Sequence, residues 1–498
     1  EISACLVGSE MCIRDRMIAG CAIGQAQFSV KYDSEVQPKD NIQYFTPAGN
    51  NLFVGDCIPF YKDGVFYLYW LLDEGHHSAL NGLGGHQWCV STSSDLKSWR
   101  HHPIAIGIDE NWEKSICTGS VTFDGKQYYA FYATRLITQD DQINEQLSYA
   151  VSKDGLTFKK QKPNPFYTSA PGYSKRHFRD PKVIIDKEGV FHLFVSSETD
   201  NYVISEGRGC LVHLTSKDLK NWQVQEPLIS GMRDVPECPD YFQWNGWYYL
   251  VYGQGGDTYY VKSRNPYGLW EYPESQALLE QWVNVAKTAE FKDNRRIVAG
   301  WVPSKRENKD YGPERFGGSI ILREAYQLPN GDLATKFPAE AIWATRSPLR
   351  VNLTEAENAK KVSDREVLLD AQGAIGGAYI KDMPYNCRVT LEIEPVSNSD
   401  EYGLFLRAKD KANDGYKLSL NPNKRTVRLG EDAFIEVVPG LDEPVKVDII
   451  MKNDIIDVCI GDRRCIVNRL PEKKGNYLWF YAKQGTVKFR NIKVSPLL

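Results

Sequence analysis

The 498-residue chain has no long apolar run past its N-terminus, no paired cysteine spacing and no strong net charge. Nothing there approaches the roughly 18 apolar residues that a membrane-spanning helix needs. The eleven cysteines are scattered without C-x-x-C spacing, so neither a disulfide framework nor a zinc site can be read, and we expect mostly buried free thiols. The net charge of −4 gives no basic surface for nucleic acid or for an anionic membrane.

The chain also lacks a glycine-rich loop that opens a helix, so we expect no phosphate site and no nucleotide cofactor. Aromatic residues, in contrast, are abundant, with 28 Tyr and 12 Trp. Aromatic side chains favour strands and supply apolar faces with polar edges, which suit sugars. A neutral or weakly polar carbohydrate is therefore the expected partner, and we expect no cofactor.

The first 26 residues do not match the rest of the chain. Residues 1–16 join no periodic segment, and we exclude them from fold reasoning as foreign to the native protein. The segment from Met17 to Cys21 resembles the end of a bacterial lipoprotein signal, in which the cysteine carries a lipid anchor. Residues 23–26 fit an ordinary signal-peptidase cut equally well, and a plain N-terminal arm is the third reading. We expect an extracytoplasmic protein that is periplasmic, secreted or anchored through Cys21.

A repeating unit runs through residues 40–345. Five segments share an apolar run, a polar turn with Gly or Asn, and a second apolar or aromatic run, which is a strong hairpin signal. They are residues 59–69, 121–129, 183–192, 241–249 and 291–298. A second polar turn that closes on an aromatic residue follows the first four, at residues 94–99, 152–158, 216–222 and 263–270. Two hairpins make a four-stranded blade, so the sequence predicts an all-β fold with a five-bladed propeller at 40–345.

The rest of the chain does not follow the repeating hairpin pattern. Residues 346–366 are polar and contain Pro348, and we expect them to form a linker that is partly helical. From Val367 onward, short apolar runs alternate with polar turns without the blade pattern. This pattern predicts an antiparallel β-sandwich over residues 367–498, in which no catalytic group is evident.

Three acids occupy equivalent positions in three of the repeats. Asp56, Asp180 and Glu237 each stand eight or nine residues ahead of a turn glycine. Taken singly, each is more often a turn residue, a local ion-pair partner or a solvated side chain. In a radial array, however, equivalent positions meet at the axis, so we expect the three carboxylates in one pocket. Paired carboxylates are the requirement of glycosidic bond cleavage.

The neighbours of these acids indicate different tasks. Arg179 should hold Asp180 ionised and suited to binding sugar hydroxyls. Glu237 lies between two prolines and a cysteine, a rigid apolar setting that should raise its pKa as a general acid requires.

The order of an Asp in the first blade, Arg179-Asp180-Pro181 in the third and Glu237-Cys238 in the fourth resembles glycoside hydrolase family 32, the β-fructofuranosidases. The resemblance covers most of residues 45–495 and implies a propeller with a C-terminal sandwich. It implies that Asp56 is the nucleophile, Glu237 the general acid/base and Asp180 the stabiliser of the transition state, with Arg179 and Thr118 contacting the substrate. It also implies retention of configuration and no metal.

The chain departs from the family pattern around the nucleophile. The family's Trp-Met-Asn-Asp-Pro-Asn-Gly box is reduced to residues 53–59, and its usual Gln is replaced by Leu71 or Leu72. The following loop carries His76, His77 and His86 instead. We expect these histidines to be solvated or hydrogen-bonded rather than metal-bound, because no carboxylate in ligand spacing accompanies them. His86 and Trp88 are candidates for stacking on a sugar, with core packing as the alternative reading.

Two rival readings stay open. One is a different furanosidase or a glycoside phosphorylase of a related propeller family, for which Arg135, Arg176 and His177 would have to hold phosphate. The other is a sugar-binding propeller without activity, which the reduced nucleophile box would fit. The presence of all three acids favours an enzyme.

Overall fold

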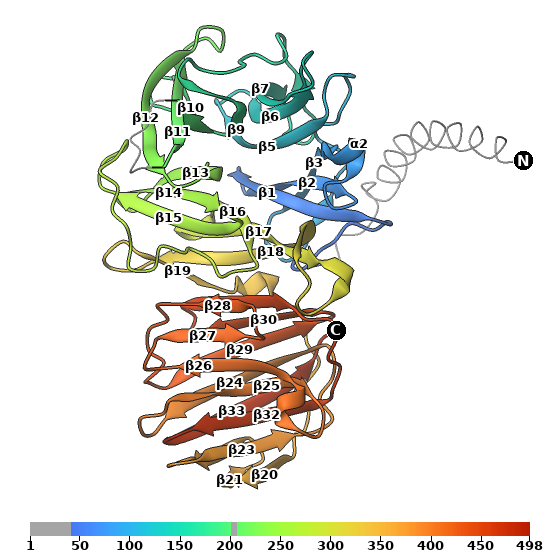
Figure 1. The fold of residues 1–498 in the computed structure, drawn as a ribbon, viewed down its shortest axis with the longest axis vertical. Coiled ribbons are helices and arrows are strands. Elements are labelled where there is room, and N and C mark those ends of the chain that lie inside the picture. Colours follow the sequence, from blue (N-terminus) through green and yellow to red (C-terminus); the bar gives the residue numbers. More distant parts are fainter. Residues whose placement is uncertain (1–40, 201–206) are drawn as a thin grey trace, which may run out of the picture.

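The computed structural model describes residues 41–200 and 207–498, so Cys21 and the signal-like segment lie outside the described residues. Two β-rich units are stacked along the long axis of the molecule, the N-terminal one above and the C-terminal one below in Figure 1. Within the described ranges, no helix is both long and apolar enough to cross a membrane.

The N-terminal unit consists of antiparallel blades of consecutive strands. Blade one is β1 (Leu52–Lys62), β2 (Val65–Glu74), β3 (Gln87–Ser93) and β4 (Arg100–His101), with the short α2 (Ala79–Gly82) in its loop. Blade two is β5 (Ser115–Phe123), β6 (Tyr128–Ile137), β7 (Ile143–Ser152) and β8 (Lys159–Lys160). Blade three is β9 (Tyr173–Ile185), β10 (Phe191–Thr199), β11 (Gly209–Ser216) and β12 (Gln223–Met232). Blade four is β13 (Glu237–Trp244), β14 (Trp247–Gln254) and β15 (Asp257–Ser263). Blade five is β16 (Asn284–Phe291), β17 (Arg295–Lys305), β18 (Glu314–Gln327) and β19 (Leu333–Lys336), with the 3₁₀ turns η1 (Lys292–Asn294), η2 (Arg306–Asn308) and η3 (Ala339–Ala341).

The first strand of each blade lies at the hub. Strands β1, β5, β9, β13 and β16 each contact the next, and β16 contacts β1, so the contacts form a closed cycle. Blade five also pairs with blade one directly, through Val54 and Gly318. The five-bladed propeller expected from the repeats is therefore confirmed, although blade four has only three full strands and an isolated bridge from Lys262 to Glu271 in place of its fourth.

The turn residues explain why the repeats are legible in the sequence. The tight turns between β1 and β2 and between β13 and β14 need positive φ at both central residues. Asp63 and Gly64 have φ of 50° and 82°, and Asn245 and Gly246 have φ of 47° and 80°. The second repeated turn is held by its aspartate: the carboxylate of Asp95 accepts the backbone N–H groups of the two residues before Trp99.

The C-terminal unit is a sandwich of two seven-stranded sheets. One sheet contains β20 (Leu353–Glu357), β23 (Ile375–Ile380), β32 (Tyr477–Lys483), β25 (Glu401–Ala408), β26 (Tyr416–Asn421), β27 (Thr426–Leu429) and β28 (Ala433–Ile435), with η4 (Ala412–Asp414) between β25 and β26. The other contains β21 (Ala359–Ser363), β22 (Glu366–Asp370), β33 (Thr486–Pro496), β24 (Cys387–Pro395), β29 (Val445–Lys452), β30 (Ile455–Ile460) and β31 (Arg464–Arg469). The sandwich is confirmed, but the predicted linker is wrong from residue 353 onward. Polar edge strands β20 and β21 were mistaken for a linker because one face of each is solvated.

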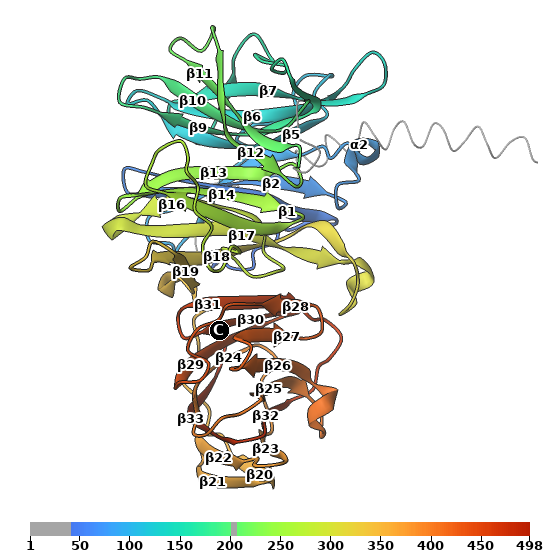
Figure 2. The same ribbon diagram turned by 60° about the vertical axis from the view of Figure 1, so that its left-hand side comes forward.

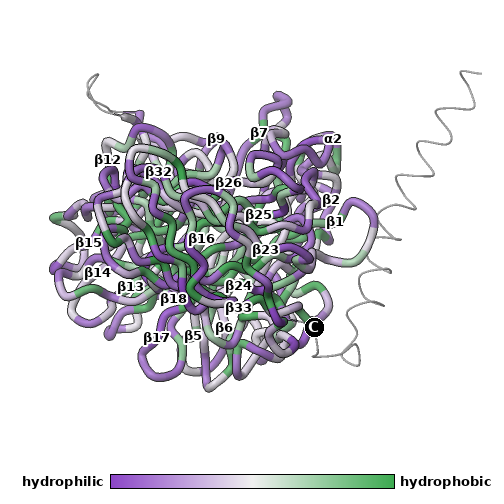
Figure 3. The backbone as a smooth tube through the Cα atoms, turned by 90° about the horizontal axis from the view of Figure 1, so that it is seen from below, coloured by the Kyte–Doolittle hydropathy of each residue, from purple (hydrophilic) through white to green (hydrophobic). Residues whose placement is uncertain are grey.

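The interior of both units is apolar. In the view along the long axis in Figure 3, hydrophobic stretches of backbone gather toward the middle of the picture. Hydrophilic stretches form many of the turns at its edge. All eight cysteines in the described ranges are buried and free, as their scattered spacing predicted.

The two units meet through blade five. Figure 2 shows β18 and β19 facing the end of the sandwich that carries β28, β30 and β31. Arg323 of β18 reaches Asp457 of β30 at 2.7 Å and Glu280 of the propeller, and all three side chains are almost fully buried. Tyr44 donates to the same Asp457 carboxylate at 2.7 Å. The sandwich is thus attached by a buried, charged contact and lies away from the hub where the acids meet.

Candidate active site

A one-residue β-bulge recurs at the same level of all five hub strands. In each blade, a stretch of three residue steps along the hub strand pairs with a stretch of only two along the neighbouring strand. The bulged stretches are residues 54–57, 116–119, 179–182, 237–240 and 284–287. Asp56, Thr118 and Asp180 lie inside bulges, and Glu237 comes directly before one. A bulge bends the strand and redirects its side chains. The repeated bulge is how the hub strands turn functional side chains toward the axis.

The bulges also store backbone strain. The first bulged residue has positive φ in three blades, at Asp180 (53°), Cys238 (48°) and Val285 (31°). This region is uncommon for residues with a side chain, and for β-branched valine it is an outlier. Such strain persists where the surrounding structure enforces it, and it concentrates at functional sites.

A cavity of about 320 Å³ opens among these bulges. Its lining brings together the three acids that the sequence placed in one phase, Asp56, Asp180 and Glu237. Of the other site residues predicted, Arg179, His86 and Thr118 also line it. The volume falls in the range of small-molecule sites. The expected convergence of carboxylates from blades one, three and four on a common pocket is confirmed.

Asp56 is held by three donors from three blades. The Thr118 hydroxyl donates a short hydrogen bond to Oδ2, and the Trp301 indole N–H donates to Oδ1 at 3.1 Å. The Cys238 thiol lies 3.5 Å from Oδ2. The carboxylate therefore has a fixed orientation in the lining of the cavity.

Glu237 has the raised pKa that its sequence context predicted. Burial is the main cause, the nearby charge of Arg179 lowers the pKa, and the charge of Asp56 raises it. Arg179 donates to Glu237 at 3.3 Å. A carboxyl group with a raised pKa retains its proton nearer to neutral pH, which suits proton donation.

The pKa of Asp180 contradicts the expectation that Arg179 keeps this carboxyl group ionised. Burial raises the pKa of Asp180 to about 7, and Arg179 offsets this only in part. The guanidinium stands 3.6 Å from Asp180 and is shared with Glu145 and Glu237. The backbone N–H of Cys238 donates to the Asp180 carboxylate at 3.0 Å. The sequence showed the neighbouring arginine but not how many acids it serves or how deeply Asp180 is buried.

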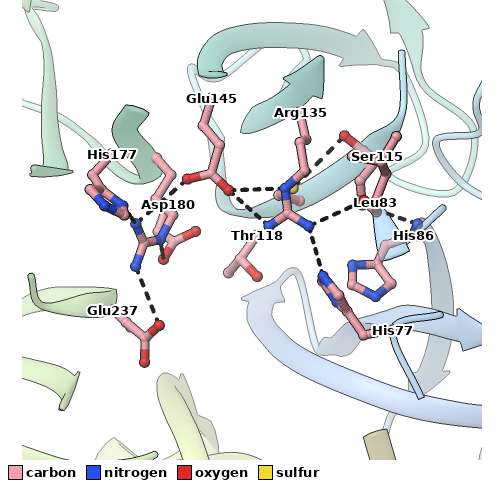
Figure 4. Close-up of polar contacts among 12 residues, drawn as sticks. His77, Leu83, His86, Ser115, Thr118, Arg135, Glu145, His177, Asp180 and Glu237 are labelled. Atoms are coloured by element: carbon pink, nitrogen blue, oxygen red, sulfur yellow. Dashed lines mark hydrogen bonds and ion pairs between the residues drawn. The ribbon is translucent and has the colours of Figure 1, made fainter. Parts of the chain in front are cut away.

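A chain of charges crosses the cavity wall (Figure 4). Glu145 lies between two arginines, 2.9 Å from Arg135 and 3.5 Å from Arg179. Arg135 also donates to the His77 ring at 2.9 Å, and Arg179 donates to His177 at 2.8 Å. Sequence reasoning missed Glu145 because β7 is not a hub strand and carries no repeated motif.

The histidine loop does have a carboxylate beside it. Asp73, His77 and His86 offer ligand atoms within 4.8 Å of one another, so the sequence argument that no acid accompanies these histidines is wrong. One nitrogen of each ring is engaged otherwise, since His86 Nε2 is 3.0 Å from Asp73 Oδ1 and Arg135 donates to His77 Nε2. His77 Nδ1 and Asp73 Oδ2 are buried without a hydrogen-bond partner. Because Nε2 accepts the bond from Arg135, the proton of a neutral His77 lies on Nδ1, and a protonated Nδ1 cannot bind a metal. The bond also places the positive charge of Arg135 beside the site. The donor set therefore fits a hydrogen-bonded wall better than a metal.

Trp88 does not have the stacking role predicted for it. Its ring is fully buried between Tyr69 and Tyr132, its indole N–H donates to the Cys117 carbonyl, and it is absent from the cavity lining. Packing in the core, the alternative reading, is correct. His86 does line the cavity, with its ring stacked on Phe316 at 5.0 Å.

Leu71 and Phe316 form an apolar part of the wall beside Asp56. A side-chain carbon at Gly55 would stand 3.0 Å from the Phe316 ring and 3.2 Å from Leu71. A side chain before Asp56 would thus crowd Leu71 and Phe316, which occupy the space beside Gly55. No feature of the sequence pointed to Phe316 as part of this wall.

Comparisons with known proteins agree with this geometry. The model of the glycosyl hydrolases family 32 N-terminal domain matches residues 56–327. A levanase of Bacillus subtilis is 24% identical over 94% of this chain and 71% of its own length. A sucrose-6-phosphate hydrolase of Escherichia coli is 27% identical over 53% of this chain and 58% of its own length.

Solved structures share the whole fold at low sequence identity. The exo-inulinase of Aspergillus awamori superimposes with a TM-score of 0.67 at 16% identity, covering 94% of this chain and 99% of the other. The β-fructofuranosidase of Bombyx mori gives a TM-score of 0.68 at 18% identity over 98% of both chains. The family model spans more than half of the chain and begins at Asp56, so this chain belongs to glycosyl hydrolase family 32.

Proposed function

We propose that this chain is a retaining hydrolase of β-fructofuranosyl bonds. Its family membership and the fructoside-hydrolysing names of its relatives support the reaction class. The observation that carries the proposal is one cavity in which a carboxylate held by three donors faces a carboxyl group with a raised pKa. This combination supplies a nucleophile and a proton donor, as double displacement requires.

In the first step an oxygen of Asp56 attacks the anomeric carbon of the fructosyl unit. Glu237 gives its proton to the glycosidic oxygen as that bond breaks, which leaves a fructosyl ester on Asp56 and a free alcohol. In the second step Glu237 takes a proton from water, the water oxygen bonds to the anomeric carbon, and Asp56 is released. Asp180 and Thr118 are placed to bind hydroxyls of the fructosyl unit while charge develops.

The proposal is tested by fructose release from sucrose, inulin, levan and a panel of arabinofuranosides. We expect release from at least one fructoside, with the β-anomer of fructose appearing first by NMR. First appearance of the α-anomer would indicate inversion, and cleavage of arabinofuranosides alone would assign a different furanosidase.

The rival phosphorylase reading has lost its support. It required Arg135, Arg176 and His177 to hold phosphate, but Arg135 is paired with Glu145 at 2.9 Å, and Arg176 and His177 are absent from the cavity lining. Membership of family 32 also separates the chain from a related propeller family.

An extracytoplasmic location belongs to the proposal as well. It is supported by the lipoprotein-like stretch that ends at Cys21. Labelling with a fatty-acid analogue should mark the protein expressed with its native N-terminus, and a Cys21→Ala variant should remain unlabelled.

A chelator should leave the activity unchanged. His77 and His86 are committed to Arg135 and Asp73, and the proposed steps use only carboxyl groups and water. The measurement is fructose release before and after dialysis against EDTA. A loss that added zinc or calcium restores would assign a metal to Asp73, His77 and His86 and overturn this prediction.

Substitution of Arg179 should move the alkaline limb of the pH profile. The charge of Arg179 lowers the pKa of Glu237, so Arg179→Met should raise that pKa. Glu237 would then hold its proton to higher pH, and the alkaline limb of kcat/KM should shift upward, whatever the loss in absolute rate. An alkaline limb that stays in place or moves to lower pH would mean that another group sets it.

A further inference from the structure

Blade five contributes a residue at the register position that Glu237 holds in blade four. Glu237 is the last paired residue before the bulge of β13, opposite Gly253. Asn284 is the last paired residue before the bulge of β16, opposite Trp301. The residue that follows has positive φ in both strands, Cys238 at 48° and Val285 at 31°. The strained bulge in blade five therefore turns Asn284 toward the cavity as the bulge in blade four turns Glu237.

Asn284 is joined there by an exposed acid. Its amide donates to Glu314 Oε1 at 2.8 Å, and both residues line the cavity. The backbone of Gly255 and Gly256 forms the adjoining wall. A side-chain carbon at Gly256 would stand 3.3 Å from Asn284 Oδ1, so the glycine keeps the space beside the amide open. An amide, a carboxylate and bare backbone next to one another make a surface for hydroxyl groups.

This surface lies on the side of Glu237. Burial raises the pKa of Glu314, its hydrogen bond with Asn284 lowers it, and the charges of Asp257 and Glu237 raise it further. Gly253, opposite Glu237, contacts Val285 next to Asn284. A leaving group departs from the side of the general acid, so it would meet Asn284 and Glu314.

The charge of the cavity restricts what that leaving group can be. The lining contains two arginines, and both are paired with acids. Burial lowers the pKa of His77 to about 4, so this histidine is neutral near pH 7. The acids outnumber the arginines, and they are Asp56, Glu145, Asp180, Glu237 and Glu314. A phosphate on the leaving group would therefore find no lining arginine that is not already paired with an acid.

We propose that Asn284 and Glu314 form the leaving-group subsite, that it takes the hydroxyls of a neutral sugar, and that it discriminates against a phosphorylated one. This inference rests on the proposed fructoside hydrolysis and names the substrate class within it. It sets this chain apart from the sucrose-6-phosphate hydrolases among its relatives.

The test compares leaving groups. Purified protein and its Glu314→Gln variant are assayed on sucrose, on sucrose phosphorylated at glucosyl O6, and on β-fructofuranosyl fluoride, whose fluoride leaves without contacting hydroxyl-binding groups. The native protein should prefer sucrose to its phosphate. Loss of a hydrogen bond to a charged group should lower kcat/KM on sucrose by roughly 10- to 100-fold. The loss on the fluoride should be at least about tenfold smaller. Glu290→Gln, an exposed change on the same β16 strand as Asn284, is the matched control.

A second variant tests the charge argument. Glu314→Lys should raise the ratio of kcat/KM on phosphorylated sucrose to that on sucrose by roughly tenfold or more. Equal losses on sucrose and the fluoride in Glu314→Gln would overturn the subsite. A native preference for phosphorylated sucrose would overturn the neutral class. If the native protein turned over no fructoside, including the fluoride, the proposed function would fail and the subsite with it, which is a different result from either of the others.

Discussion

Asp56→Asn is expected to lower kcat by about four orders of magnitude or more while the fold stays intact. The amide has the shape of the carboxylate, so Trp301 can still donate to its oxygen, while the Thr118 hydroxyl can turn to accept from its NH2 group. What the amide lacks is the charge and nucleophilicity needed to form the covalent ester. The measurement is steady-state fructose release together with the thermal unfolding midpoint. Asp141→Asn, an exposed substitution of the same kind, should match the native protein in both.

Glu237→Gln should lower kcat on sucrose by a comparable factor. Its turnover should be restored, however, by a substrate that needs no proton donor and a nucleophile that needs no base. Fluoride needs no proton to leave, and azide needs no base to attack. β-Fructofuranosyl fluoride with added azide should therefore restore turnover in Glu237→Gln and yield β-fructofuranosyl azide. The same additions should not rescue Asp56→Asn, because the ester never forms. Rescue of neither variant, or of both alike, would contradict the separate roles given to these residues.

The repeat was readable because local chemistry encodes it. Positive φ at Asp63-Gly64 and Asn245-Gly246 favours Gly, Asn and Asp, and those residues are visible in a sequence. The phase of the three acids against such turns then predicted a common pocket. The sandwich was equally visible from its alternating strands, but its edge strands β20 and β21 were not, because polar residues at an edge look like a linker.

Only those site residues that belong to a local sequence motif could be predicted. No local pattern encodes the fivefold bulge, which is a register relation between two strands. Asn284 and Glu314 were missed for that reason: their relation to Glu237 exists only once β16 is paired with β17. Trp88 shows the converse error, since an aromatic residue near the pocket in sequence is buried behind it in space. Asp180 shows that electrostatics depends on burial as much as on a neighbour, because burial raises its pKa although Arg179 is adjacent.

Arg323→Met should destabilise the protein more than any substitution outside the cavity considered above. Arg323 is the cation between Glu280 and Asp457, whose side chains are 0% exposed. Removing it leaves two buried acids without their ion-pair partner, which typically costs about 3–5 kcal/mol. Because the chain has two units, unfolding should be followed separately in each by hydrogen exchange. Loss of protection on both sides of the β18–β30 contact is the expected result.

Two comparisons separate this buried contact from an ordinary surface pair. Arg425→Met removes the cation of another contact between the units, with Glu274, but there the side chains are 45% and 63% exposed, so the change should cost less than about 1 kcal/mol. The loss in Arg323→Met should also shrink as the pH falls. Burial already raises the pKa of Asp457 to about 6, and removal of Arg323 raises it further. The orphaned acid then takes up a proton on acidification and its charge disappears. A loss that is independent of pH, or equal in the two variants, would show that packing rather than charge holds the sandwich to blade five.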